Sequence, residues 1–116
     1  MNMRINRTFS FDAAHRLPWH SGKCQNLHGH TYRLEVSVSG PINADGIILD
    51  FADLDAQVRS LIVNRYDHQY LNDHFDNPTA ELLAMSFFKQ LEASGLAVDE
   101  LTLWETANSS ATVRRD

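Results

Sequence analysis

Residues 31–39 (TYRLEVSVS) carry the most regular pattern in this 116-residue chain, a strict alternation of apolar and polar side chains. In an extended strand, Tyr32, Leu34, Val36 and Val38 point to one face and the residues between them point to the other. Such a strand is half buried, because one of its faces is apolar and the other is suited to water. The alternation therefore predicts a sheet with one covered face and one open face.

Two further patterns complete the predicted architecture. Strands are expected at residues 4–12, 31–39, 101–105 and 111–115. After Asp50 the apolar period changes to that of a helix. A second helix is expected to open with Asn77 as its cap and Pro78 in its first position, and to stop near Gly95. This order of elements predicts an α+β fold, with two helices on one face of a four-stranded antiparallel sheet. The open edges of such a sheet could pair with other copies of the chain.

Composition limits the classes of protein that the chain can belong to. The length and the apolar fraction of 43% fit one domain, residues 1–116. No apolar run approaches the ~20 residues that span a membrane, and residues 1–10 do not resemble a secretory signal, so a cytoplasmic location is expected. The single cysteine excludes an internal disulfide and fits a reducing compartment. The net charge of -5 argues against nucleic-acid binding, which needs basic surface.

A group of histidines indicates a metal site. His28 and His30 are two residues apart in a segment that leads into the predicted strand, so both imidazoles face the same side. His15 ends the first predicted strand and could supply a third ligand if the two strands pair. Three histidines with an open fourth position are typical of catalytic zinc. Cys24 could instead close the tetrahedron of a structural site, and His20 is a competing ligand, so the spacing alone leaves these alternatives open.

Other residues are candidates for acid–base chemistry. Cys24 lies among polar residues, which favours a reactive thiol, although a lone cysteine is more often a small buried hydrophobe. Asp67 and His68 are a possible acid–base pair, or else a solvated loop pair. Glu105 continues the apolar face of its strand, where a carboxylate without a donor is costly. We therefore expect Glu105 at a sheet edge or against a ligand that offers N–H groups.

The chain resembles a known family, the 6-pyruvoyl-tetrahydropterin synthase and 6-carboxy-tetrahydropterin synthase family, whose members have the tunnelling fold. The matching stretches come in the family's order and run from near the first residue to near the last. They are residues 11–17 (FDAAHRL), 22–24 (GKC), 27–30 (LHGH), 46–54 (GIILDFADL), 66–72 (YDHQYLN), 78–81 (PTAE) and 104–106 (WET).

The resemblance implies a role for each candidate residue. It implies zinc bound by His15, His28 and His30. It implies Cys24 as general base, and Asp67 with His68 as the partner pair, commonly from a neighbouring subunit. It implies that Glu105 anchors the guanidine-like edge of the pterin and that Thr79 lies on the pterin side. Family members act on 7,8-dihydroneopterin triphosphate and typically assemble as hexamers, with sheets joined across subunits.

The short spacing from Cys24 to His28 and His30 resembles that of the bacterial 6-carboxy-tetrahydropterin synthases of the queuosine route. This branch converts its substrate to 6-carboxy-5,6,7,8-tetrahydropterin and releases acetaldehyde and triphosphate. A pyruvoyl-forming triphosphate lyase is the alternative, and a pterin-binding protein without catalysis is another. One departure from the family is Leu82, which stands where the family often has asparagine.

Overall fold

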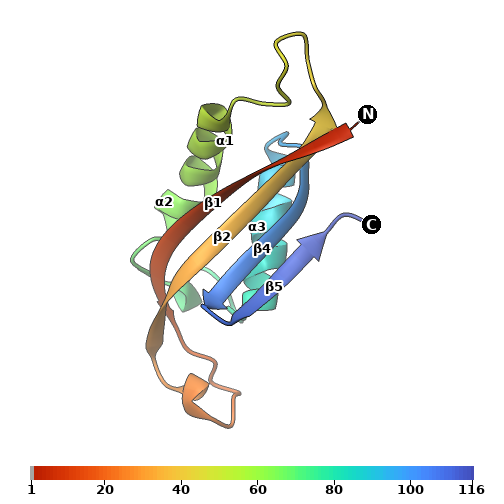
Figure 1. The fold of residues 1–116 in the computed structure, drawn as a ribbon. Helices are drawn as coiled ribbons and strands as arrows, with labels where there is room; N and C mark the ends of the chain where they lie inside the picture. Colours follow the sequence, from red (N-terminus) through yellow and green to blue (C-terminus); the bar gives the residue numbers. More distant parts are fainter. Residues whose placement is uncertain (1) are drawn as a thin grey trace.

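In the computed structural model, which describes residues 2–116, one sheet runs the length of the molecule with its helices on a single face (Figure 1). The strands are β1 (Asn2–His15), β2 (His28–Pro41), β3 (Gln69–Tyr70), β4 (Val98–Thr106) and β5 (Ser109–Arg114), in the order β3-β1-β2-β4-β5. Neighbours among β1, β2, β4 and β5 are antiparallel, as predicted. The short strand β3 is a correction to the predicted four-stranded sheet, and it lies parallel to β1 through two residue pairs.

The hairpin of β1 and β2 is longer than the sequence pattern indicated. The two strands pair continuously from Asn2 opposite Pro41 to His15 opposite His28. At the end that carries the histidines, each strand is therefore three residues longer than the predicted ranges 4–12 and 31–39. His15 ends its strand as predicted, while His28 and His30 lie inside β2 rather than in a segment before it.

The helices follow the predicted order, but one start was wrong. Helix α1 (Phe51–Val58) begins after Asp50, whose carboxylate accepts a hydrogen bond from the Ala52 N–H at 2.7 Å. A π-helical turn, η2 (Arg59–Val63), and the short α2 (Asn64–Tyr66) continue it. No helix within residues 2–116 is long and apolar enough to cross a membrane.

Helix α3 (Ala80–Ala93) does not begin at Asn77 and Pro78 as predicted. Its cap is Thr79, whose hydroxyl accepts a hydrogen bond from the Leu82 N–H at 3.1 Å. Asparagine and threonine both suit this position, so the composition of the segment did not distinguish them. The helix ends as predicted, since Gly95 has a φ of 95° shortly after its last residue.

The covered face of the sheet and the inner faces of the helices form the core. On β2, Tyr32, Leu34 and Val36 are fully buried, as their alternation predicted. Phe11 of β1 stacks on Tyr32, with ring centroids 5.2 Å apart, and meets Phe87 of α3 edge-on. Cross-strand partners point to the same face of a sheet. Because Phe11 pairs with Tyr32 and His15 with His28, the paired histidines lie on the same face as the core.

The capping bond of Thr79 should contribute measurably to stability. We expect Thr79→Ala to lower the free energy of unfolding by about 1 kcal/mol, because the first turn of α3 loses a hydrogen-bond acceptor. Thr79→Ser keeps the hydroxyl and should lose much less. Urea denaturation followed by circular dichroism measures both variants. Equal stability of the alanine and serine variants would show that the cap does not stabilise the helix.

Candidate active site

Three histidines from the β1–β2 hairpin bring their rings together at one end of the core. His15 is completely buried, whereas His28 and His30 are half buried. The ring centroids lie 4.5 to 5.0 Å apart. The ladder explains this convergence, because His15 lies directly opposite His28 and His30 lies one pair further along the same face. The structure thus brings together the three residues that the sequence singled out as metal ligands.

The three Nε2 atoms point toward a common centre. The Nε2 of His15 lies 2.9 Å from that of His28 and 3.2 Å from that of His30. Ligand nitrogens on one tetrahedral zinc ion, at bond lengths of about 2.0–2.1 Å, would be separated by about 3.3 Å. The spacing of the three nitrogens is therefore close to that of ligands on a single ion.

Backbone carbonyls fix two of the rings in the form that binds metals. The Nδ1 of His15 lies 2.8 Å from the Pro78 carbonyl, and the Nδ1 of His28 lies 2.8 Å from the Asn26 carbonyl. A carbonyl can only accept, so both Nδ1 atoms carry the proton and both Nε2 lone pairs are free. Such outer hydrogen bonds orient metal-binding histidines and raise their basicity.

Burial keeps two of the imidazoles neutral. It lowers the pKa of His15, against the opposing effects of the Pro78 carbonyl and the Glu105 carboxylate. Burial also lowers the pKa of His30, and Glu105 again opposes this effect. Since neutral imidazole is the form that coordinates a metal, protonation competes weakly at this site near neutral pH. The donor set and the geometry together fit a divalent ion that accepts nitrogen ligands.

Cys24 lies outside this histidine group. Among residues 2–116, the ligand atoms that lie within 4.8 Å of one another at this end of the core are those of the three histidines alone. Cys24 belongs to the short 3-10 helix η1 (Lys23–Gln25) and is a half-buried free thiol. The competing ligand His20 is also outside the group, and its Nδ1 instead accepts the Gly22 N–H at 2.9 Å. This arrangement favours the open three-histidine site over the closed Cys-His₃ alternative.

A cavity of about 490 Å³ brings Cys24 together with other candidates. Its wall includes Thr79 from the start of α3 and Glu105 from β4. Glu105 is half buried, and its Oε1 lies 3.7 Å from the Nε2 of His30. Because β4 lies between β2 and β5, Glu105 is not on an edge strand, and contact with a ligand that offers N–H groups stays a prediction. A thiol, a hydroxyl and a carboxylate line one cavity, close to the histidine group.

Asp67 and His68 pair with each other, although adjacent residues rarely do so. The Nδ1 of His68 lies 3.0 Å from Asp67 Oδ2. The pairing depends on an unusual backbone, since His68 has a φ of 60° and is the one non-glycine residue among residues 2–116 with a positive φ. A hydrogen bond to Asp67 and its negative charge raise the pKa of His68. His68 thus favours its protonated form more than an isolated histidine does.

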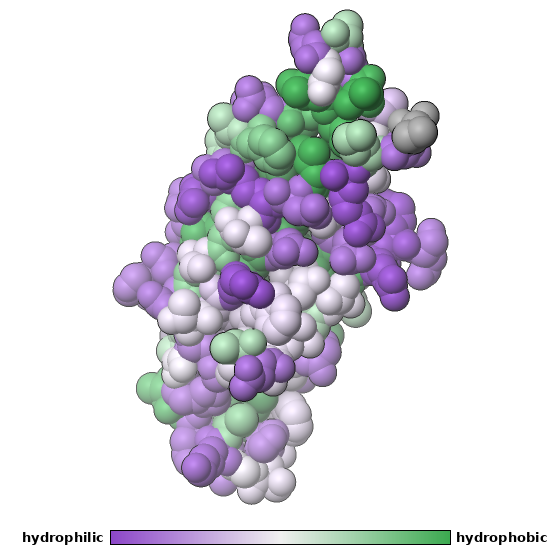
Figure 2. Space-filling model, in the orientation of Figure 1, coloured by the Kyte–Doolittle hydropathy of each residue, from purple (hydrophilic) through white to green (hydrophobic). Residues whose placement is uncertain are grey.

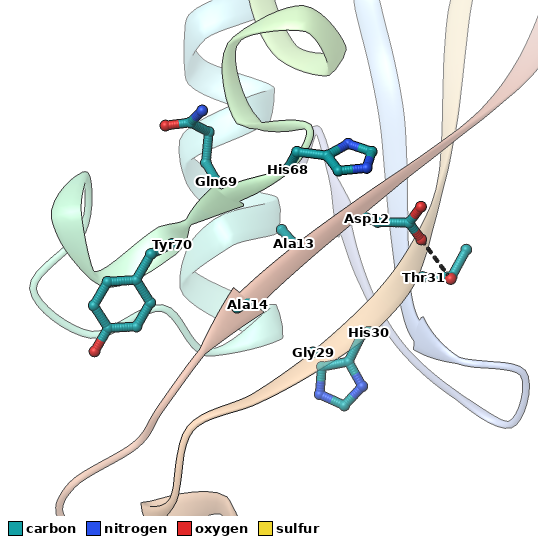
Figure 3. Close-up of a pocket in the computed structure, with 9 residues that line it drawn as sticks. All are labelled: Asp12, Ala13, Ala14, Gly29, His30, Thr31, His68, Gln69 and Tyr70. Carbon is teal, nitrogen blue, oxygen red and sulfur yellow. Dashed lines mark hydrogen bonds between the residues drawn. The ribbon is translucent and has the colours of Figure 1, made fainter.

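Within one chain, His68 and Cys24 lie in different cavities. His68 lines a hollow beside β1 and β2, together with Asp12, His30, Thr31 and Tyr70 (Figure 3). Asp12 and Thr31 are cross-strand partners on the open face of the sheet, because their neighbours Phe11 and Tyr32 point into the core. The structure therefore does not bring the Asp67–His68 pair to Cys24 inside a single subunit.

The sequence did not reveal the groups that hold these residues in place. The carbonyls of Asn26 and Pro78 belong to the backbone, and because every residue has one, the residue type does not indicate their role. Asp12 lies in a recognisable stretch, but only the fold shows that it contacts the pair at residues 67–68. The remaining histidine, His74, is exposed.

The fold and the three convergent imidazoles define a class, that of tunnelling-fold proteins with a histidine site suited to a metal ion. A family model described as 6-pyruvoyl tetrahydropterin synthase matches residues 4–116, and the chain belongs to this family. The resemblance noted in the sequence is confirmed.

Individual relatives cover most of the chain. A 6-carboxy-5,6,7,8-tetrahydropterin synthase from Synechocystis is 39% identical over 92% of this chain and 89% of its own length. A dihydroneopterin monophosphate aldolase from Pyrococcus furiosus is 37% identical over 90% of this chain and 91% of its own length. The structure of Caenorhabditis elegans 6-pyruvoyl tetrahydropterin synthase matches with a TM-score of 0.87 at 27% identity, and the match covers 100% of this chain and 97% of that one.

Removal of one imidazole should abolish metal binding. We expect the purified protein to retain about one divalent ion per chain and His28→Ala to retain almost none, because two nitrogens hold a metal ion poorly. His28 is preferable to the fully buried His15, whose loss could unfold the chain. His74→Ala removes an exposed histidine and is the matched control. Plasma mass spectrometry of the dialysed proteins measures the metal content. An unchanged metal content in His28→Ala would contradict the assignment of His28 as a metal ligand.

Proposed function

We propose that this protein is a zinc-dependent carbon–carbon lyase that converts 7,8-dihydroneopterin triphosphate to 6-carboxy-5,6,7,8-tetrahydropterin. The reaction consumes one water, releases acetaldehyde and triphosphate, and serves queuosine biosynthesis. The observation that carries the proposal is the convergence of three Nε2 atoms, 2.9 and 3.2 Å apart, beside a thiol that lies outside their group. The name of the Synechocystis relative and the short spacing from Cys24 to His28 support the carboxy-forming branch.

His15, His28 and His30 would hold the zinc ion. When bound, zinc supplies Lewis-acid polarisation of the substrate's side-chain oxygens. The Pro78 and Asn26 carbonyls keep two of these rings in the ligating tautomer. Burial lowers the pKa of His15, so that ring stays neutral at the pH where the enzyme works.

Cys24 acts as the general base. It lines the same cavity as Glu105, so a pterin held by Glu105 would share that cavity with the thiol. Glu105 accepts hydrogen bonds from the guanidine-like edge of the pterin, which supplies the N–H donors that a half-buried carboxylate needs. The Thr79 hydroxyl accepts the Leu82 N–H and still has a hydrogen to donate into the cavity.

His68 acts as the general acid, oriented by Asp67. The hydrogen bond and the charge of Asp67 raise the pKa of His68, which favours the protonated form that can donate. Because His68 and Cys24 line different cavities of one chain, the complete site requires His68 of a second copy.

We propose a homohexamer with active sites between subunits, in which residues 1–116 form one domain of each subunit. Strand β5 ends the sheet on one side, and on the other side β3 covers only two residues of β1. Met3, Ile42, Ile47 and Phe51 are exposed and line one shared hollow, and Figure 2 shows apolar surface gathered at one end of the molecule. Both features offer surface for association. Light scattering that gave the mass of a monomer would contradict this assembly.

A cytoplasmic location and a small-molecule substrate complete the proposal. The single cysteine fits a reducing compartment. Figure 2 shows polar and near-neutral side chains over most of the open sheet face, and the net charge of -5 disfavours nucleic acid as a partner.

Product analysis tests the proposed reaction. Incubation with 7,8-dihydroneopterin triphosphate should release acetaldehyde and triphosphate and yield a carboxylated pterin on chromatography. Release of triphosphate without acetaldehyde would favour a pyruvoyl-forming enzyme, the activity in the name of the Caenorhabditis elegans structure. Tight binding of the pterin without turnover would favour a non-catalytic binding protein. Turnover of the monophosphate alone would favour the activity named for the Pyrococcus relative.

Substitution of Cys24 separates a base from a metal ligand. Cys24→Ala should lower kcat by about 100-fold or more, the usual effect of losing a general base, while the zinc content stays that of the wild type. Metal content and turnover are measured on the same preparation. Parallel loss of zinc and activity would favour the Cys-His₃ alternative over the open site.

A further inference from the structure

Asp12 of β1 contacts both members of the Asp67–His68 pair through its backbone. Its N–H donates to Asp67 Oδ1 at 2.9 Å, and its carbonyl accepts the His68 N–H at 2.6 Å. The second contact holds the left-handed backbone of His68 against the strand. The pair is therefore attached to the sheet at a single residue.

The Asp12 side chain is held beside the same pair. Thr31, its cross-strand partner, donates its hydroxyl to Asp12 Oδ1 at 2.5 Å, the contact drawn as a dashed line in Figure 3. Ligand atoms of Asp12, Asp67 and His68 all lie within 4.8 Å of one another. The imidazole of His68 thus has two carboxylates as close neighbours, one from its own loop and one from the sheet.

We propose that Asp12 is a positioning residue for His68, and that its carboxylate, oriented by Thr31, joins Asp67 in keeping the imidazole in place and in its cationic form. No substrate contact is required of Asp12, because it acts through His68. Its catalytic consequence rests on the proposed function, in which His68 donates a proton.

The charges around His68 support this role. Asp67 raises the pKa of His68 most, desolvation lowers it by less, and the charge of Asp12 makes the smallest contribution, which raises it. The other titratable residues that line the hollow are His30 and Tyr70, and burial lowers the pKa of His30, which leaves it neutral near pH 7. Asp12 is therefore the carboxylate outside the pair whose removal should change the protonation of His68.

Nuclear magnetic resonance of the histidine rings tests the proposal without any assay of activity. Asp12→Asn keeps an oxygen for the Thr31 hydroxyl but removes the charge. We expect a lower pKa for His68 in this variant than in the wild type, and a still lower pKa in Asp67→Asn. The His68 signal is assigned by its loss in His68→Gln. The shift caused by Asp12→Asn should shrink as salt is added, because His68 is largely exposed and the effect is a charge effect.

Two further variants keep the test specific. Asp53→Asn removes an equal charge from the exposed first turn of α1 and should leave the pKa of His68 unchanged. Thr31→Val matches threonine in volume but releases the Asp12 carboxylate, so it should lower the pKa in the same direction as Asp12→Asn. An unchanged His68 pKa in both Asp12→Asn and Thr31→Val would overturn the proposal.

The pH profile of kcat shows the catalytic consequence. An acid must be protonated to act, so activity falls as the pH rises through the pKa of His68. Asp12→Asn lowers that pKa, so its activity should fall at lower pH than that of the wild type, whereas Asp12→Glu should follow the wild type. Asp12→Asn could shift the pKa of His68 measured by nuclear magnetic resonance and leave the pH profile of kcat unchanged. That result would contradict His68 as the general acid and so the proposed function. It would leave the interaction between Asp12 and His68 intact.

Discussion

The register of the β1–β2 hairpin is the constraint on which the rest of the structure depends. A shift by one residue would move every side chain of a strand to the opposite face. The same ladder that stacks Phe11 on Tyr32 in the core also places His15 opposite His28. Because core packing and the histidine group share one register, the apolar residues that fold the sheet also specify the geometry of the site.

Different effects dominate the protonation of the two groups of histidines. The histidine group lies at the end of the core, where desolvation keeps His15 and His30 neutral and able to coordinate an ion. His68 lies on the open side of the sheet, where Asp67 instead favours the charged form. An environment suited to a metal and one suited to an acid thus lie close together, with His30 in the wall of the hollow that also holds His68. Association of two copies is what would bring these environments to one substrate.

The elements that repeat a pattern could be predicted from the sequence, and the elements that depend on single contacts could not. Alternation over residues 31–39 located β2, and the two-residue spacing of His28 and His30 indicated a shared face. The strand β3 has only two residues, too few for any period.

The true cap of α3 was missed because two capping residue types stand close together. The tautomers of the histidines depend on backbone carbonyls, and the pair at residues 67–68 depends on a positive φ. These features arise from tertiary structure and leave no signal in residue type.

The two residues before α3 serve different partners at the same time. The carbonyl of Pro78 holds the ring of His15, while Thr79 caps the helix and lines the cavity beside Cys24. A covalent chain connects the two residues directly, so an insertion or deletion at this point would affect both. An insertion or deletion between Pro78 and Thr79 would displace both the ring of His15 and the cavity wall. Insertions should therefore be tolerated in the surface loops and excluded from this junction.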